Sequence, residues 1–248
     1  MTSPYPPAQT VEEFEANIAE VLRRIDAAAV RAGRSPSDVR LLPVSKTVPQ
    51  ERLRLAVAAG CRELGENKVQ EAKRKSAEMA DLDVSWAVIG HLQTNKAKDV
   101  AAVAGEFQAL DSVRVAEALD RRLQALGRGL DVYVQVNTSA EAQKYGLPPA
   151  EVPAFLAELP AFASLRVRGF MTLAELSSDQ ERVRACFRRL RDVRDQAVQT
   201  WPEAVELSMG MSGDYETAVE EGSTCVRVGQ AIFGSRALPD SHYWPPGQ

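Results

Sequence analysis

The chain has 248 residues and a formal net charge of −4, with 45% hydrophobic and 26% charged residues. This length allows one large domain or two small ones, and the composition is typical of a globular protein rather than a disordered one. The mild acidity argues against a general nucleic-acid surface, and no apolar run approaches the roughly 20 residues that cross a bilayer. We therefore expect neither a nucleic acid nor a membrane as a partner.

The amino-terminal stretch MTSPYPPAQTVEEFEAN lacks the basic start and apolar core of a signal peptide, so we expect a cytoplasmic protein. Its first nine residues carry three prolines and predict a flexible arm. Three cysteines, Cys61, Cys186 and Cys225, are an odd number at wide spacings, which fits neither a disulfide framework nor a zinc site. We expect three buried thiols and no metal.

Helical and strand patterns alternate along the rest of the chain. Thr10 with Glu13 predicts a capping box at the start of the first helix, which Gly33 and Pro36 end. Further helices are expected over 49–59, to about 79, over 94–104, from 111 or 112 to 126, to about 159, over 179–199 and after the 209–214 turn. Apolar and β-branched runs predict eight strands, at 39–46, 61–64, 85–89, 106–110, 130–137, 165–171, 203–208 and 224–228.

Eight strands that alternate with helices at a spacing of about thirty residues predict an α/β fold, a single (β/α)₈ barrel of the TIM type. The barrel domain is expected over 10–236, between the arm at 1–9 and a tail at 237–248. The alternative is an open doubly wound sheet. No G-x-G-x-x-G motif follows the first strand, where a dinucleotide-binding sheet would need it, so the barrel is preferred.

The stretch VRLLPVSKT, residues 39–47, ends a buried strand in a single lysine, Lys46. A continuous apolar run is typical of a parallel strand packed on both faces, and such strands end where α/β folds bind their ligands. Partial burial at that place favours the neutral amine, which is a nucleophile for aldehydes. The alternative is a strand-ending lysine that only reaches solvent.

The residues that end the other strands belong on the same face of a barrel. Small residues in SMGMSG, from Ser208 to Gly213, let backbone amides approach an anion, and the following helix start adds partial positive charge. Barrels commonly bind phosphate at the loops after strands seven and eight, and Gly229-Gln230 supplies the second loop. The alternative is that these glycines only turn the chain. The candidate site thus comprises Lys46, Asn67, His91, Ser208 to Ser212 and Arg227 to Gln230.

Arg227 lies within the last predicted strand, where alternation puts it on the same face as Cys225 and Gly229. A buried arginine needs a partner. If Gly229 faces the barrel mouth, Arg227 does too, and its guanidinium would meet a ligand there. The alternative is a salt bridge with a carboxylate at a strand end.

An amine nucleophile, two anion-binding loops and a facing arginine together suit pyridoxal phosphate. The stretches LLPVSKT, LGENKVQE, WAVIGHLQTNK, VQVNTSAEAQKYG, VRGFMT, LSMGMSGDYETAVEEGST and VRVGQAIFG resemble the YggS/PROSC family of pyridoxal phosphate homeostasis proteins. The similarity covers about residues 10–236. It implies a barrel like the N-terminal domain of alanine racemase and covalent binding of pyridoxal 5'-phosphate without an established catalytic activity.

Matched by motif, the resemblance implies that Lys46 forms the Schiff base and that Arg227 faces the pyridine nitrogen. It places Asn67 of GEN close to the ring. Ser212 and Gly229-Gln230 match the phosphate contacts, and Ser208 starts the same loop. Gln230 departs from the pattern, because relatives often have threonine there; a backbone amide contact survives that change, but a hydroxyl contact does not.

Two functions of different class follow from this resemblance. The first is a carrier or buffer for the cofactor, a monomer that makes transient contact with apoenzymes; the second is an amino-acid racemase. A cation beside the pyridine nitrogen disfavours its protonation and weakens the cofactor as an electron sink, which argues against carbanion chemistry. Only 14 residues follow Gly234, so we expect no second domain to supply an acid or base, and His91 shows no partner.

A third function does not depend on the resemblance. The same strand-end residues could form a barrel enzyme for a sugar phosphate, with Lys46 as an aldolase-type amine.

Overall fold

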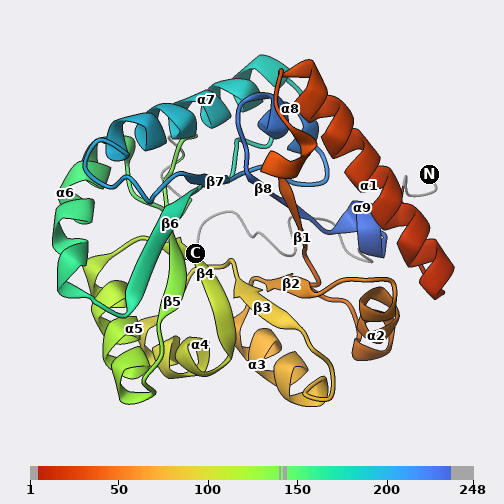
Figure 1. Cartoon of the computed structure of the whole chain (residues 1–248), viewed down its shortest axis with the longest axis horizontal. Helices are drawn as coiled ribbons and strands as arrows, with labels where there is room; N and C mark the ends of the chain where they lie inside the picture. The colour runs from red at the N-terminus through yellow and green to blue at the C-terminus, as the bar shows by residue number, and fades with distance from the viewer. Residues whose placement is uncertain (1–4, 140, 142–143, 236–248) are drawn as a thin grey trace.

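The computed structural model describes residues 5–139, 141 and 144–235. Eight parallel strands form a barrel, and helices surround it, as Figure 1 shows. The strands are β1 (Arg40–Pro43), β2 (Glu63–Glu66), β3 (Ser85–Val88), β4 (Ala104–Leu110), β5 (Leu130–Gln135), β6 (Leu165–Met171), β7 (Glu206–Ser208) and β8 (Cys225–Val228). The predicted (β/α)₈ architecture is therefore confirmed.

The sheet runs in the order β1-β8-β7-β6-β5-β4-β3-β2, and every paired neighbour is parallel. Its two ends meet between β2 and the residues that directly follow β1. Val44 forms an isolated parallel bridge with Gly65, and the Ser45 amide donates to the Gly65 carbonyl at 2.9 Å. This contact closes the barrel, so the carboxyl ends of all eight strands open on one face.

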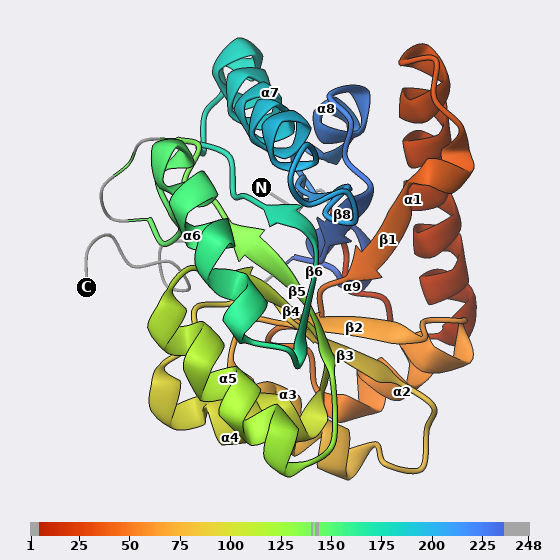
Figure 2. The same ribbon diagram turned by 60° about the vertical axis from the view of Figure 1, so that its left-hand side comes forward.

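The helices lie outside the barrel in both views (Figures 1 and 2). They are α1 (Val11–Arg31), α2 (Gln50–Ala58), α3 (Val69–Glu78), α4 (Ala97–Val103), α5 (Val113–Ala125), α6 (Val152–Glu158), α7 (Gln180–Ala197), α8 (Tyr215–Glu220) and α9 (Gln230–Phe233), with 3₁₀ turns at Pro36–Asp38, Thr94–Lys96, Pro149–Glu151 and Leu159–Ala161. None of the helices in the described ranges is long and apolar enough to cross a bilayer.

The first helix begins as predicted. The Thr10 hydroxyl accepts from the Glu13 amide, and the Glu13 carboxylate accepts from the Thr10 amide, both at 3.2 Å, which completes the capping box. One face of α1 buries Phe14, Val21 and Ile25. The helix thereby covers α8 and α9 and supports the loops after β7 and β8 from outside.

The described part of the amino-terminal arm packs against α9. Ala8 is buried, and the Tyr5 carbonyl accepts from the Ser235 amide at 2.9 Å. The Arg52 side chain donates to the carbonyls of Ala8 and Phe233, which ties the arm to the end of α9. Residues 1–4 of the predicted arm, residue 236 and the predicted tail at 237–248 lie outside the described residues.

Some strand boundaries differ from the prediction. The second strand was expected at 61–64 but spans Glu63–Glu66. It extends to Glu66 because Gly65 packs closely beside Val44 and because the buried Glu66 carboxylate forms an ion pair with Lys75. The seventh was expected from Glu203 but begins at Glu206. The sequence pattern predicts that Glu66 is exposed to solvent. Its burial becomes favourable only through the ion pair with Lys75 of α3.

The core has an outer and an inner part. Two large apolar clusters involve the surrounding helices, whereas a small cluster of Leu42, Ala87 and Cys225 is separate from both. The polar side chains of Gln108, Ser208 and Arg227 are buried beside this small cluster. Arg227 is hydrogen-bonded to Ser208, and Ser208 is hydrogen-bonded to Gln108. All three cysteines are free and buried, as predicted.

Candidate functional site

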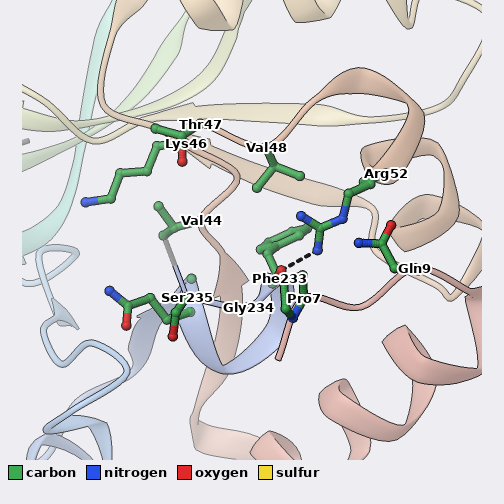
Figure 3. Close-up of a pocket in the computed structure, with 12 residues that line it drawn as sticks. Pro7, Gln9, Val44, Lys46, Thr47, Val48, Arg52, Phe233, Gly234 and Ser235 are labelled. Carbon is green, nitrogen blue, oxygen red and sulfur yellow. Dashed lines mark hydrogen bonds between the residues drawn. The ribbon is translucent and has the colours of Figure 1, made fainter. Parts of the chain in front are cut away.

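Lys46 follows β1 at the open end of the barrel. It is half-buried and lines a pocket of about 310 Å³ together with Val44, Gly229 and Gln230. Figure 3 shows its side chain extending away from Arg52, on the opposite side of Val44. The structure therefore brings the predicted nucleophile together with the predicted second loop.

Backbone bonds fix the turn that carries Lys46. The Val44 amide donates to the Val228 carbonyl at 2.8 Å, so the residues before the lysine are held by β8 as well as by β2. Thr47, directly after it, has a φ of 67°, the left-handed region that non-glycine residues rarely adopt. The parallel ladder ends at Val44, and the chain leaves the strand direction in the turn formed by Lys46 and Thr47.

A buried ion pair lies directly behind this turn. Lys75 of α3 donates to the Glu66 carboxylate at 2.6 Å and to the Ser45 carbonyl at 2.9 Å, and both charged side chains are fully buried. The Ser45 hydroxyl donates to the same carboxylate at 2.7 Å. Burial raises the pKa of Glu66, and the positive charge of Lys75 opposes that shift. The pair thus connects α3 and β2 to the residue that precedes Lys46.

The loops after β7 and β8 meet at Ser212. Its hydroxyl accepts from the amides of Gly229 at 3.3 Å and Ala231 at 3.5 Å, at the start of α9. Gly210 has a φ of 96°, and a Cβ there would lie 2.6 Å from Ala218, so only glycine fits. Asp214 holds the turn by accepting from the Met211 amide at 2.6 Å. Two backbone amides and a hydroxyl therefore converge at this point.

A side chain at position 229 would crowd the neighbouring strand. A Cβ added to Gly229 would lie 3.1 Å from the Val44 carbonyl oxygen. The close approach places the amide of Gly229 beside the turn that carries Lys46. The predicted anion-binding loop thus lies against the backbone of Val44, two residues before the predicted nucleophile.

Arg227 is buried, with 3% of its surface exposed. Its guanidinium donates to the Ser208 hydroxyl at 2.6 Å and to the Thr172 carbonyl at 2.7 Å. Burial lowers the pKa of Arg227, and the nearby acidic groups oppose the shift, Cys225, Asp214 and Glu106 in that order. Among the described residues no carboxylate forms a salt bridge with it, so the predicted alternative of a strand-end ion pair is wrong.

Ser208 is fully buried, unlike Ser212. Its hydroxyl accepts a hydrogen bond from Arg227 and donates one to the Gln108 side chain at 2.7 Å. Direct contact of Ser208 with a ligand stays a prediction, but its observed neighbours are two side chains inside the barrel.

Asn67 and His91 follow β2 and β3. Gly90 packs on the Asn67 backbone so closely that a Cβ would lie 2.0 Å from the Asn67 carbonyl oxygen. The His91 ring stacks on Tyr145 at 3.9 Å, and its Nδ1 lies 3.3 Å from the Asp111 carboxylate. Burial raises the pKa of Asp111, and His91 opposes the shift. His91, which had no visible partner in the sequence, therefore has two.

The sequence interpretation missed five residues that support the site: Lys75, Gln108, Asp111, Tyr145 and Thr172. Gln108 was detectable in principle, because it is an uncharged polar residue within the apolar part of a strand. Lys75 was not, because it stands among the charged residues of α3 and looks like a solvated lysine. Tyr145 lies in a loop whose path no local pattern predicts.

Comparison with known proteins agrees with this geometry. A family model of the alanine racemase N-terminal domain matches residues 15–237. A pyridoxal phosphate homeostasis protein of Pseudomonas aeruginosa is 42% identical over 223 residues, covering 89% of this chain and 94% of that relative. Both findings span nearly all of the barrel.

Solved structures give the same result. PipY of Synechococcus elongatus PCC7942, with PLP bound, is 38% identical with a TM-score of 0.75, and the match covers 86% of this chain and 100% of PipY. An alanine racemase of Clostridium difficile 630 in complex with cycloserine has a TM-score of 0.75 at 14% identity, covering 97% of this chain and 64% of the racemase, and shares the fold. The chain therefore belongs to the family of pyridoxal phosphate homeostasis proteins, which is built on the alanine racemase N-terminal domain.

Proposed function

We propose that the chain binds pyridoxal 5'-phosphate covalently, as a Schiff base on Lys46, and acts in the cytoplasm as a carrier or buffer of this cofactor without catalytic turnover. The single observation that carries the proposal is the pocket in which Lys46 meets Gly229 and Gln230. The names of the relatives and the PLP bound to PipY support it.

The residues of the site suit the chemistry of the group. The amides of Gly229 and Ala231, which donate to the Ser212 hydroxyl in this structure, would donate to the phosphate instead, and the Ser212 hydroxyl would join them. A phosphate favours backbone donors at a helix start. Arg227 would face the pyridine nitrogen, and Asn67 would lie beside the ring. The Gln230 side chain carries no hydroxyl, so we propose that position 230 contributes through its backbone.

When bound, the group supplies an aldehyde. Lys46 Nζ is the amine that would attach to this aldehyde as the Schiff base proposed above. Lys75, paired with Glu66, donates to the Ser45 carbonyl next to Lys46, which ties the turn to α3. Because water can hydrolyse a Schiff base, such an attachment would be reversible, as a carrier requires.

Arg227 supports a role without turnover. A guanidinium beside the pyridine nitrogen disfavours protonation of that nitrogen, and the cofactor then stabilises a carbanion poorly. The racemase alternative rests on the shared barrel and on the His91–Asp111 pair, which offers a titratable group at the mouth. The same holo-protein can be tested for both functions.

The experiment is absorbance spectroscopy of protein titrated with pyridoxal 5'-phosphate. Wild type should develop imine absorbance, and Lys46→Ala should retain only the spectrum of the free aldehyde. Lys73→Ala is the matched control, because Lys73 is an exposed lysine paired with Asp99. Imine absorbance in Lys46→Ala equal to that of wild type would exclude Lys46 as the attachment site.

The carrier function needs its own test. Wild-type protein loaded with the cofactor is mixed with an apoenzyme that requires it, and recovery of that enzyme's activity is followed. Recovery that is at least as fast as with an equal concentration of free cofactor supports a carrier, whereas no recovery contradicts delivery.

A further inference from the structure

Arg227 is the end of a hydrogen-bonded chain that runs through the inside of the barrel. Arg227 donates to the Ser208 hydroxyl at 2.6 Å, and Ser208 donates to Gln108 Oε1 at 2.7 Å. The other end of the Gln108 amide, Nε2, donates to the Glu106 carboxylate at 2.6 Å. Arg40 of β1 donates to the other oxygen of that carboxylate at 2.6 Å. We call these residues, Arg227, Ser208, Gln108, Glu106 and Arg40, the interior chain.

The donor and acceptor of each hydrogen bond between Arg227 and Glu106 follow from the chemistry of these two residues. Arginine can only donate, so the Ser208 oxygen accepts from Arg227 and its own proton goes to Gln108. An ionised carboxylate can only accept, so Gln108 must turn its NH₂ group to Glu106 and its oxygen to Ser208. One orientation of the Gln108 amide therefore satisfies both neighbours, and hydrogen bonds aligned in this way strengthen one another.

The surroundings leave these side chains little freedom. Gln108 and Ser208 are fully buried, and the Gln108 Nε2 lies 3.9 Å from the Cys225 sulfur. The Thr172 carbonyl accepts from the second guanidinium nitrogen of Arg227 at 2.7 Å. Ser208 on one side and Thr172 on the other thus determine the plane of the guanidinium. Both acceptors, a hydroxyl and a backbone carbonyl, are uncharged.

The far end of the interior chain is anchored by charge. Arg40 also donates to Tyr133 at 3.1 Å and to Glu63 at 2.8 Å, near the amino ends of the strands. Burial raises the pKa of Glu106, and Arg40 and Gln108 oppose the shift. The interior chain therefore links Arg227, through Ser208 and Gln108, to charged residues near the amino ends of the strands.

We infer that Gln108 and Ser208 are positioning residues that hold the Arg227 guanidinium in the orientation presented to the bound cofactor. The identity of that cofactor rests on the function proposed above, but the orientation of Arg227 does not. Ser208 thereby acts on the ligand through Arg227. The electronic state of the pyridine nitrogen then depends on a glutamine inside the barrel.

The first measurement uses protein without cofactor. NMR gives the rate at which the Arg227 guanidinium rotates about its Cζ–Nη bonds, with signals assigned through Arg227→Lys. Ser208→Ala should accelerate the rotation by about tenfold, the scale of one lost hydrogen bond to a charged group. Gln108→Met, which leaves Ser208 bonded to Arg227 but without its own acceptor, should accelerate it in the same direction by a smaller factor. The double variant should be no faster than Ser208→Ala alone, because the two residues act in series.

Ser223→Ala is the matched control. Ser223 is also fully buried, but its hydroxyl donates to backbone carbonyls, that of Met209 at 2.8 Å among them. Its loss should lower stability and leave the rotation of Arg227 at the wild-type rate. If Gln108→Met does not fold, Ser208→Ala decides the question, since it removes a single oxygen. Equal rotation in wild type, Ser208→Ala and Gln108→Met would overturn the inference.

The second measurement uses protein loaded with pyridoxal phosphate labelled with ¹⁵N in the ring. The pyridine ¹⁵N shift of wild type should be that of an unprotonated nitrogen, and Gln108→Met should move it toward the protonated value at the same pH. A shift that is unchanged in Gln108→Met contradicts the effect on the cofactor. If wild type does not take up the label, the proposed function fails, and the rotation rates still decide whether Gln108 positions Arg227.

Discussion

Replacing Lys75 by methionine should destabilise the protein strongly, although Lys75 lies in a helix full of charged residues. Methionine keeps an unbranched side chain, one heavy atom shorter than that of lysine, and removes the charge together with the donor to Glu66 and to the Ser45 carbonyl. It leaves the Glu66 carboxylate fully buried, with the Ser45 hydroxyl on Oε1 and no hydrogen-bond partner for Oε2 among the described residues. Removing one member of a buried pair costs about 3–5 kcal/mol, because an uncompensated charge remains.

The pH dependence gives a second signature of the same loss. Burial already raises the pKa of Glu66 above its usual 4.5, and without Lys75 the pKa should rise further. A raised pKa in the folded state means that the folded protein binds a proton more tightly than the unfolded chain does. The stability of Lys75→Met should therefore fall as the pH rises from about 4.5 to the folded-state pKa, and then stay constant.

Urea unfolding at pH 5 and pH 8 measures both effects. Lys75→Met should lose less stability at pH 5 than at pH 8, and adding Glu66→Gln should recover stability at pH 8. Lys73→Met is the control, because that lysine is exposed on the same helix and should cost only about 0–1 kcal/mol. A loss below about 1 kcal/mol for Lys75→Met at pH 8, or equal losses at both values, would refute the reasoning.

Three other predictions concern the site and the thiols. Ser212→Ala should weaken pyridoxal phosphate binding by about 1–3 kcal/mol, as expected for one hydrogen bond to a charged group, and leave pyridoxal binding almost unchanged; equal weakening of both in calorimetry would assign the serine to the fold. Holo-protein with alanine in deuterated water should exchange the α-hydrogen far more slowly than the roughly 1–1000 per second of enzymes, and rapid Lys46-dependent racemisation would overturn the carrier proposal. Burial raises the pKa of Cys61 to about 11, so its thiolate should be roughly a hundredfold scarcer at pH 8 than that of an ordinary thiol, and labelling as fast in the native as in the unfolded protein would contradict this.

The barrel itself was predictable because its signal is local and repeated. Apolar runs mark most strands, and the capping box at Thr10 satisfies the first amides of α1 without any distant partner. The position of Lys46 just after the first strand was predictable for the same reason, since it follows the apolar run LLPV at 41–44. These features depend on neighbours in the sequence, and the structure confirms the elements.

The support of the site was harder to predict, because it depends on side chains far apart in the chain. Glu66 and Lys75 lie in segments whose sequence predicts exposed side chains. Burial of each becomes favourable only because the two form an ion pair. Gln108 meets Ser208 across 100 residues of sequence. A pattern within one strand indicates that Gln108 faces inward but gives no information about the hydroxyl it meets.

The central claim is that pyridoxal 5'-phosphate is attached to Lys46. The most direct test is borohydride reduction of wild-type protein with the cofactor, followed by proteolysis and mass spectrometry of every lysine-containing peptide. The account predicts one stable pyridoxyl adduct, on the peptide that contains Lys46, and none on Lys75. An adduct on another lysine, or no adduct at saturating cofactor, would contradict it.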